Sequence, residues 1–596
     1  MPRIDRSESN LFPWPKGAYI RNKAYVYINV SNKYVSPAEK QEKGTRGYTG
    51  HDSLCIGVTY DPERPQIKKL YANAAYRAAI MPAELPAPPR IADSLAVGLT
   101  SWIAEASDQS GLSKSLAEAF EEQEAQLILD LAAYMLSNES AVMQHFPAWA
   151  REHVLFSDDI RDDTYLGQFL KYNLSITKIK KFRTLWASAN IGDGRIFLCY
   201  DSTNVNSQAE GVFIVQKGHA KDDPTLSQIN TDYVIRQSDG LPLTYLHSPG
   251  SVSDIAQAPE MIRFIGHIKK LTAKDVRLCL ICDRGYISAA NLKHMDENGL
   301  EYMLMLRTNF NKFDELADSV IDSIKSYKYE IKDRNGDERY GVTRNCVLYD
   351  GGPECCAQII WSAEKYNNKR TAVKNTVELQ RAKLEEFIAG NVGKSFEPEE
   401  LSWIPAYFRL KREKGESRLA VKKKRGRLGG SETIEIERFK ILGYEDDEAA
   451  INRLYQKAGI MITVSRAQMT AQEANDAYAK RDCIEKTFEA LKSHLGMDKI
   501  GVTTEEAMHG KGLIWFVASI LHALLFNRTS SLRVTDRKHF TVPCMIEELE
   551  AIKADKNMST GKRERRYKLT SRQLKIFKFW NITEETIDSR IASIDD

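Results

Sequence analysis

The sequence predicts a mixed α/β core, with a sheet flanked by helices and a long β-rich insertion that interrupts it. Two short apolar runs, RIFLCY before Asp201 and VRLCLIC before Asp283, have the length and composition of buried strands. Helical segments lie between and after these runs, and strands that alternate with helices indicate an α/β core. Between 311 and 455, charged β-like pieces and a long polar helix from about 366 to 390 replace the core pattern.

The composition is typical of a soluble globular protein. The chain has 596 residues, of which 42% are hydrophobic and 28% charged, with a formal net charge of +3. Such values exclude disordered and fibrous classes. Nine cysteines without framework spacing indicate a reducing, cytoplasmic location. The strongest apolar stretch, 513–526, is too short to span a membrane. It predicts a buried helix, and no membrane partner is expected.

The first 189 residues divide into two parts. Residues 1–90 contain the β-rich stretches KAYVYINV and DSLCIGVTY, which predict a small β-containing element. Residues 91–189 carry apolar side chains at helical spacing, as in SLAEAFEEQEAQLILDLAAYMLS, and predict a helical region. The N-terminal third is therefore expected to lie outside the α/β core.

The core itself is predicted in two parts around the insertion. Residues 190–310 hold both aspartate-terminated runs. Between these runs lie the segments GVFIVQ, DYVIRQ and LPLTYLH, separated by the Gly, Pro and Asp residues typical of turns in a β-meander. Residues 311–455 form the predicted insertion domain, and 456–530 resume the core with the strand GIMITVS and a helix from about 471 to 495. Residues 531–596 are predicted to be a basic, helical C-terminal region.

Asp201 and Asp283 are candidate metal ligands because each follows a buried strand, where a rigid backbone brings the carboxylate out at the sheet edge. Carboxylates with few nearby His or Cys residues are hard oxygen ligands suited to Mg²⁺ or Mn²⁺, which work with substrate phosphates. A single aspartate at a strand end more often begins a turn or caps a helix. A third ligand is therefore needed.

The helix after Thr470 supplies such a ligand. The T-x-x-E capping box formed by residues 470–473 fixes where this helix begins. At about 100° per residue, Tyr478, Arg481, Glu485 and Lys492 fall on one narrow stripe that borders the apolar face. A salt-bridged surface helix would also carry the Arg481–Glu485 pair, so the stripe alone leaves both interpretations open. A functional site additionally predicts a carboxylate with Arg, Lys and Tyr beside it.

The string Tyr478-x2-Arg481-x3-Glu485-x6-Lys492 resembles the Y-R-E-K signature of a large family of bacterial insertion-sequence DDE transposases. YDSTNV around Asp201 and CDRGY around Asp283 resemble the first and second catalytic aspartate motifs of that family. The resemblance covers roughly 190 to 310 and 456 to 530.

The resemblance implies a ribonuclease-H-like core in which Asp201, Asp283 and Glu485 bind two Mg²⁺ or Mn²⁺ ions. Such a site performs phosphodiester hydrolysis and transesterification. The implied protein is a DNA transposase that cleaves double-stranded DNA at terminal inverted repeats and transfers the ends to target DNA, by a cut-and-paste route. It would act as a homodimer in a synaptic complex, in the bacterial cytoplasm and on the nucleoid when bound to DNA. Two alternatives stay open: a ribonuclease-H-like nuclease without integration, and a catalytically silent DNA-binding derivative.

The resemblance also implies DNA contacts. Arg481 and Lys492 would hold phosphates at the element end, and Tyr478 would add a hydrogen bond or a stacking surface. Trp403 in the insertion is a candidate for stacking on a flipped base, with ordinary packing as the alternative. Residues 91–189 would recognise the element ends. A basic run in the insertion would follow DNA phosphates, unless it is simply solvated: Lys422, Lys423, Lys424 and Arg425.

Overall fold

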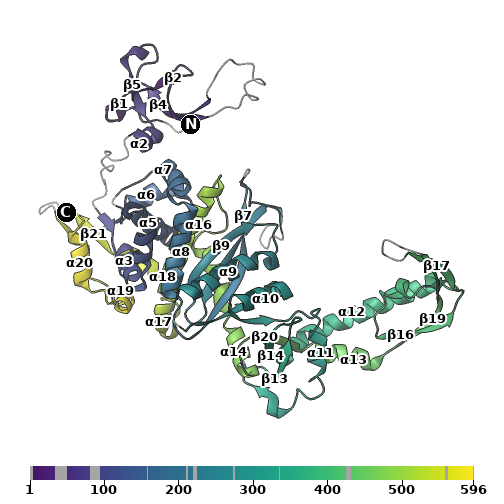
Figure 1. Ribbon diagram of the computed structural model, residues 1–596. Coiled ribbons are helices and arrows are strands. Elements are labelled where there is room, and N and C mark those ends of the chain that lie inside the picture. The colour runs from purple at the N-terminus through teal and green to yellow at the C-terminus, as the bar shows by residue number, and fades with distance from the viewer. Residues whose placement is uncertain are drawn as a thin grey trace, which may run out of the picture.

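The computed structural model describes residues 4–33, 50–80, 94–157, 159–209, 212–218, 225–272, 275–334, 336–423, 431–556 and 562–594. Figure 1 shows a small N-terminal unit, a large body and an arm that extends away from the body. Each of the three has its own hydrophobic cluster. They can therefore be described separately, beginning with the body because it holds the predicted catalytic residues.

The body is built on a nine-stranded mixed sheet with the order β12-β13-β14-β20-β11-β10-β7-β8-β9. β10 runs parallel to both β7 and β11, and the remaining neighbours are antiparallel. The predicted mixed α/β core is confirmed. The strands are β7 (Arg195–Ser207), β8 (Ser227–Arg236), β9 (Leu241–Pro249), β10 (Arg277–Cys282), β11 (Glu301–Met305), β12 (Glu330–Ile331), β13 (Arg339–Val347), β14 (Glu354–Ser362) and β20 (Ile460–Ser465).

Helices cover the sheet on both faces (Figure 1). α9 (Asp254–Leu271) and α10 (Ala289–Glu297) pack together, and α9 reaches β7 through a hydrogen bond between Ser202 and Asp254. α14 (Ala471–Ala479), α15 (Asp482–His494) and α16 (Glu505–Arg528) pack on other parts of the sheet. Side chains alternate between faces along a strand, so α9 lies on the face of Ser202 and α15 on the face of Asp201.

α16 is the central helix of the body. It is apolar all round, and most of its side chains are buried, including Trp515 and Phe516. Its length and hydropathy would suit a membrane span, but 78% of its most apolar window is buried inside the protein. A helix that is apolar all round belongs in a core, so the predicted buried helix is confirmed.

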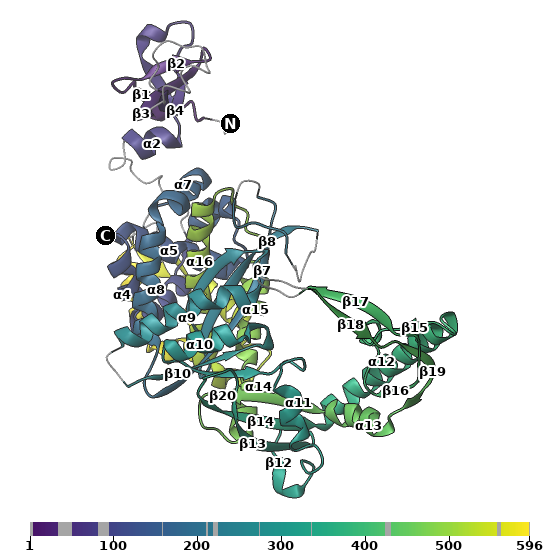
Figure 2. The same cartoon turned by 45° about the vertical axis from the view of Figure 1, so that its right-hand side comes forward.

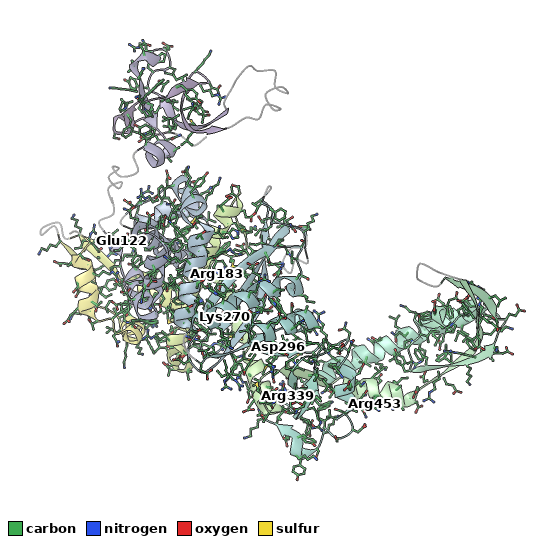
Figure 3. The ribbon with its side chains drawn as sticks, in the orientation of Figure 1. Glu122, Arg183, Lys270, Asp296, Arg339 and Arg453 are labelled. Atoms are coloured by element: carbon green, nitrogen blue, oxygen red, sulfur yellow. The ribbon has the colours of Figure 1, made fainter. Side chains whose placement is uncertain are left out.

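The helices α3 (Gly98–Ser110), α4 (Leu112–Ala119), α5 (Glu122–Asn138), α6 (Phe146–Ala150), α7 (Asp163–Gln168) and α8 (Ile176–Asn190) form a layer beside the sheet. Arg183 of α8, labelled in Figure 3, joins this layer to the sheet. Its Nε donates to Oγ1 of Thr244 on β9 at 3.0 Å, and its guanidinium lies 4.7 Å from the ring of Phe264 on α9.

The sequence predicts a helical C-terminal region, but the structure contains strands there as well as helices. It contains α17 (Ser530–Thr535), α18 (Val542–Glu550), α19 (Ser571–Phe577) and α20 (Glu584–Ala592), and also β21 (Lys553–Lys556) and β22 (Arg563–Arg565). β21 pairs with β22 and also with β6 (Ser94–Ala96), which lies more than 450 residues earlier in the sequence. Such pairing between distant segments leaves no periodic signal in the sequence. Trp102 and Trp580 pack edge to face 5.4 Å apart across this junction.

The predicted insertion begins later than residue 311. β12, β13 and β14 belong to the core sheet, and α11 (Phe313–Asp318) packs against β14 and β20. The chain leaves the sheet after Ser362 and returns at Ile460, directly beside it, because Trp361 pairs with Ile460. The polar and charged residues of β13, among them Arg339 and Arg344, gave this segment the appearance of a separate domain.

The arm therefore spans the chain between Ser362 and Ile460 (Figure 2). It begins with α12 (Ala363–Gly390), which confirms the predicted long helix. It continues through β15 (Ser395–Phe396), β16 (Phe408–Lys414), β17 (Arg418–Lys423), β18 (Ser431–Ile436), β19 (Phe439–Asp446) and α13 (Glu448–Lys457). Val377, Leu384 and Phe408 form its small core.

The N-terminal unit is a five-stranded antiparallel sheet with the order β1-β5-β4-β3-β2. α2 (Ala74–Ile80) packs against β4 and lies near α7 of the body. The strands are β1 (Leu11–Pro13), β2 (Tyr19–Arg21), β3 (Tyr25–Lys33), β4 (Gly50–Thr59) and β5 (Lys69–Ala72).

Candidate active site

Asp201 and Asp283 lie at the same edge of the sheet. β7 and β10 are parallel and in register, with Tyr200 opposite Cys282, so the two aspartates are the next residues on neighbouring strands. The sequence placed Asp201 at the end of its strand, but β7 continues to Ser207 in pairing with β8. Asp201 therefore sits where the parallel partner ends, within an otherwise rigid strand.

The predicted single helix over 471–495 is wrong, because the chain breaks between α14 and α15. The capping box at Thr470 is present as predicted. At the break, the N–H of Arg481 donates to the carbonyl of Tyr478 at 3.0 Å, a tighter turn than an α-helix makes. α14 packs against β13 and β14, whereas α15 packs against β7 and β8. Two helices in different directions can pack on these two separated pairs of strands, whereas one straight helix could not pack on both.

Arg339, labelled in Figure 3, holds α14 to the edge of the sheet. Its guanidinium donates to Oδ1 of Asn475 on α14 at 3.0 Å and pairs with Asp333 at 2.9 Å. On the other side of the break, Cys483 of α15 contacts Cys199 of β7, with 3.6 Å between the sulfur atoms. Both contacts fix the turn that carries Arg481.

Arg481 joins two of the three predicted catalytic carboxylates. Its Nη1 lies 2.9 Å from Oδ2 of Asp201, and its Nη2 lies 3.0 Å from Oε1 of Glu485. The side chains of Asp201 and Arg481 are 18% and 14% exposed, whereas that of Glu485 is 63% exposed. Glu485 can therefore turn on the surface of α15, while Asp201 is fixed by its strand.

The charge on Arg481 is secured by its surroundings. Burial alone lowers the pKa of this guanidinium, but Tyr478, Asp201 and Asp283 raise the pKa above its ordinary value. Burial in turn raises the pKa of the Tyr478 hydroxyl, which stays protonated. Asp201, Asp283 and Arg481 thus belong to one electrostatic cluster, with Tyr478 beside it.

A second polar layer lies on the opposite face of β7. The hydroxyl of Ser202 donates to Oδ1 of Asp254, the first residue of α9, at 2.8 Å. Asp232 on β8 is opposite Ser202 and is 1% exposed. Burial raises the pKa of Asp232 well above its ordinary value, and the neighbouring Asp254 and Asp201 raise it further. These surroundings therefore favour the protonated, neutral form of Asp232.

Sequence reasoning did not identify this layer. Asp254 has the helix-start role expected for such a residue, but its bond to Ser202 depends on how α9 packs. The rings of Tyr200 and Tyr286 lie 4.6 Å apart beside this bond, tilted at 44° to each other. Asp232 has no local signal, because only the register of β7 with β8 brings it near the aspartate cluster.

The other predicted site residues are placed apart from the cluster or outside the described residues. Lys492 lies two turns beyond Glu485 on α15. Trp403 is in the arm, 45% exposed, with its ring edge-on to Phe387 at 5.3 Å. Lys422 and Lys423 are the last residues of β17. Lys424 and Arg425 fall outside the described residues.

The three carboxylates suit a hard divalent cation by their chemistry, since all the donor atoms are oxygens from Asp201, Asp283 and Glu485. Within the described ranges, no three His, Cys, Asp or Glu side chains already form a metal-binding group. Arg481 instead holds Asp201 and Glu485 through its own positive charge. A cation and Arg481 would therefore compete for the same carboxylate oxygens.

Together, the sheet and this carboxylate cluster define an α/β protein with an acidic site where the parallel pairing of two core strands, β7 and β10, ends. Residues 192–521 match the family model described as a transposase DDE domain. This match covers more than half of the chain and includes all three carboxylates, so the chain belongs to the DDE transposase family. Members of this family are generally dependent on divalent metal ions.

Comparison with solved structures finds the piggyBac transposase synaptic complex with hairpin DNA. The TM-score is 0.30 and the sequence identity 10%, over 83% of this chain and 79% of that chain. No curated protein sequence matches this chain.

Proposed function

We propose that this transposase cleaves double-stranded DNA at the terminal inverted repeats of a bacterial insertion sequence and joins the ends to target DNA by cut-and-paste. The observation that carries the proposal is the arrangement of Asp201, Asp283 and Glu485 around Arg481. A purely structural ion pair would not require Asp283 at the adjacent strand end. The enzyme would work in the cytoplasm and on the nucleoid, as a homodimer in the synaptic complex.

We also propose that the core is ribonuclease-H-like. The order β9-β8-β7-β10-β11, with β7, β8 and β9 antiparallel and β10 and β11 parallel to β7, supports this assignment. So does the position of Glu485 on a helix that packs across β7. In this arrangement rigid strands hold two carboxylates, and a helix adds the third.

The residues of the site have separate tasks. Asp201, Asp283 and Glu485 would hold two Mg²⁺ or Mn²⁺ ions, which supply an activated water or 3′-hydroxyl and stabilise the leaving oxygen. Neighbouring strands hold Asp201 and Asp283 at a fixed spacing, which suits these residues to hold the ions that would bind the reacting phosphate. Glu485 would add the third carboxylate from α15, where its side chain is largely exposed.

Arg481 has a role both before and after metal and DNA bind. Before DNA and metal bind, its guanidinium neutralises Asp201 and Glu485 and limits their repulsion. With cations bound by the carboxylates, Arg481 would be free to donate a bidentate pair of hydrogen bonds to a phosphate. Lys492, two turns further along α15, would contact the next part of the same DNA backbone.

Incubation of the full-length protein with end-containing DNA and Mn²⁺ tests the proposal, with the cut positions mapped on both strands. Cleavage at the element boundary and a joined element–target product are expected. Replacing Asp283 by Asn should lower cleavage more than about a hundredfold, because a metal ligand contributes several kcal/mol to the transition state, and should leave DNA binding intact.

The same experiment separates the two alternatives. Cleavage without any joined product would favour a nuclease that does not integrate. DNA binding without cleavage in the unaltered protein would favour a catalytically silent derivative, and either result would contradict the proposed transposition.

A further inference from the structure

The two faces of the N-terminal sheet differ in character. One face carries Val26 and Leu70, which are fully buried and pack with Tyr76 of α2 to form the core of this unit. Because side chains alternate along each strand, their neighbours in sequence point to the other face. This other face is called the tyrosine face below.

The tyrosine face is defined by the strand register. Tyr19 of β2 is paired with Tyr27 of β3, and Arg21 is paired with Tyr25. On β5, Tyr71 lies opposite Val58 of β4. Directly paired residues of an antiparallel sheet share a face. Val58 is also paired with Tyr25 of β3, so the two groups share one face. The tyrosine face carries Tyr19, Arg21, Tyr25, Tyr27, Lys69 and Tyr71, with the largely buried Val58 between Tyr25 and Tyr71.

Ring contacts group the aromatic side chains at two places on this face. The rings of Tyr19 and Tyr27 lie 6.2 Å apart at an interplanar angle of 26°. The guanidinium of Arg21 lies 5.9 Å from the ring of Tyr27. At the β5 side, Tyr60 packs on Tyr71 with 5.8 Å between centroids and is 46% exposed. Each ring is partly exposed rather than buried in a core.

The charge on this face is positive. Arg21 and Lys69 are exposed strand residues at opposite sides of the sheet. Lys23 in the β2–β3 turn and Lys68 before β5 are also exposed and add positive charge at the two ends. Among the described side chains at outward positions of these strands, none is acidic.

We propose that the tyrosine face binds single-stranded DNA, with bases stacked on the tyrosine rings and phosphates paired with Arg21 and Lys69. Partly exposed aromatic rings between cations are the combination that holds unpaired strands, because every base has a face that can stack. In a duplex those faces are covered by neighbouring base pairs, so the rings would gain little. The proposal rests on the proposed function only for the choice of DNA over RNA.

The test is equilibrium binding of the full-length protein to a fluorescent oligothymidylate of about 16 nucleotides, in EDTA so that no cleavage occurs. Replacing both Tyr19 and Tyr27 by Ala should raise the Kd at least about tenfold, because stacking contributes about 1 to 3 kcal/mol per base. Tyr60→Ala should raise it about fivefold. Tyr60 lies at the margin of the sheet, so this variant keeps the test valid if the double variant does not fold.

Tyr327→Ala is the matched control, since Tyr327 is 88% exposed and lies in the body. Its affinity for the oligonucleotide should equal that of the unaltered protein. Photocrosslinking with a 5-iododeoxyuridine oligonucleotide should label tyrosines of the tyrosine face. Arg21→Gln should weaken binding and reduce its dependence on salt concentration.

Unchanged affinity in both tyrosine variants, or crosslinks confined to the body, would overturn the proposal. So would equal loss of affinity for a duplex of the same length, or tighter binding of oligouridylate RNA. Failure of cleavage in the presence of Mn²⁺, with oligothymidylate binding intact, would contradict the proposed transposase activity and leave the tyrosine face assignment standing.

Discussion

At the residue scale, Arg481 links the metal-free and the active forms of the site. A guanidinium shared by Asp201 and Glu485 lowers the repulsion between two carboxylates that must stand close together. The same contact occupies oxygens that a cation requires. Metal affinity and phosphate binding are therefore expected to respond in opposite directions when this side chain is changed.

Replacing Arg481 by Gln should tighten Mn²⁺ binding about fivefold while lowering cleavage of element ends. Removing the competing ion pair, worth about 1 kcal/mol when partly exposed, strengthens cation binding. Loss of the bidentate guanidinium group removes a contact to the DNA phosphate. Calorimetric Mn²⁺ titration and a cleavage assay measure the two effects. Arg481→Lys, which keeps the charge, should show the smaller change in metal affinity; weaker Mn²⁺ binding in the Gln variant would refute the competition.

His522 of α16 makes the free energy of unfolding depend on pH. Burial, and then the charges of His494 and Arg533, lower the pKa of His522 to about 3. The imidazole is thus neutral in the folded protein, while the unfolded chain takes up a proton below its ordinary pKa near 6.5. Stability contributed by neutral His522 is therefore present above about pH 6.5 and is lost as the pH falls toward 3.

Urea unfolding at about pH 7.0 and 5.5 should show a loss of about 1 kcal/mol from this residue. In His522→Asn that part of the pH dependence should disappear, whatever the change in absolute stability. His145→Asn, at an exposed position, should keep it. An unaltered pH slope in the His522 variant would rule out this role.

At the element scale, α16 approaches its neighbours closely enough to require glycine. A Cβ at Gly510 would lie 2.2 Å from the backbone carbonyl oxygen of Leu170, and one at Gly512 would lie 2.1 Å from Nε2 of His247. Backbone atoms cannot move aside as a flexible side chain can. The close contact between α16 and the segment around Leu170 thus depends on Gly510.

Gly510→Ala should lower the free energy of unfolding by about 2 kcal/mol, a typical cost of overpacking a core. Gly167→Ala is the control, because a Cβ there meets no atom within 4 Å and alanine is the better helix former by about 1 kcal/mol. Denaturant unfolding should show that Gly510→Ala is less stable than the unaltered protein and that Gly167→Ala is more stable. Equal stability of both would contradict the close approach.

At the scale of the whole molecule, the arm is attached to the body at one point of the sheet. Ser362 and Gly459 are joined by a backbone hydrogen bond of 3.0 Å, and Trp361 pairs with Ile460. Beyond this point the arm has its own core. Its links to the body include the exposed pair of Arg453 with Asp318, in the region labelled by Arg453 in Figure 3.

Replacing residues 363–459 by a short turn should therefore leave the body folded, with a melting temperature close to that of the full chain, as β14 and β20 would form a simple hairpin. Affinity for element DNA should fall, since the arm carries Lys422 and Lys423. Scanning calorimetry and DNA binding measure the two effects. Deleting 551–596 is the comparison: it removes β21 and Trp580 from the body and should abolish its cooperative unfolding.

The sequence alone determined the features that depend on local pattern. The runs before Asp201 and Asp283 predicted core strands, the capping box fixed the start of α14, and the apolar run 513–526 identified α16 as a buried helix. Alternation and helical spacing are set by neighbours along the chain, so they can be read without knowing the fold. The family resemblance came from the same local spacing.

Tertiary structure decided what depends on contacts between distant segments. It extended the core sheet through β12–β14, paired β21 with β6, and broke the helix before Arg481 so that two helices could pack on different strands. It also placed Asp232 and Asp254 behind the aspartates. These features arise from strand register and packing between segments far apart in the chain, and a local pattern carries no record of either.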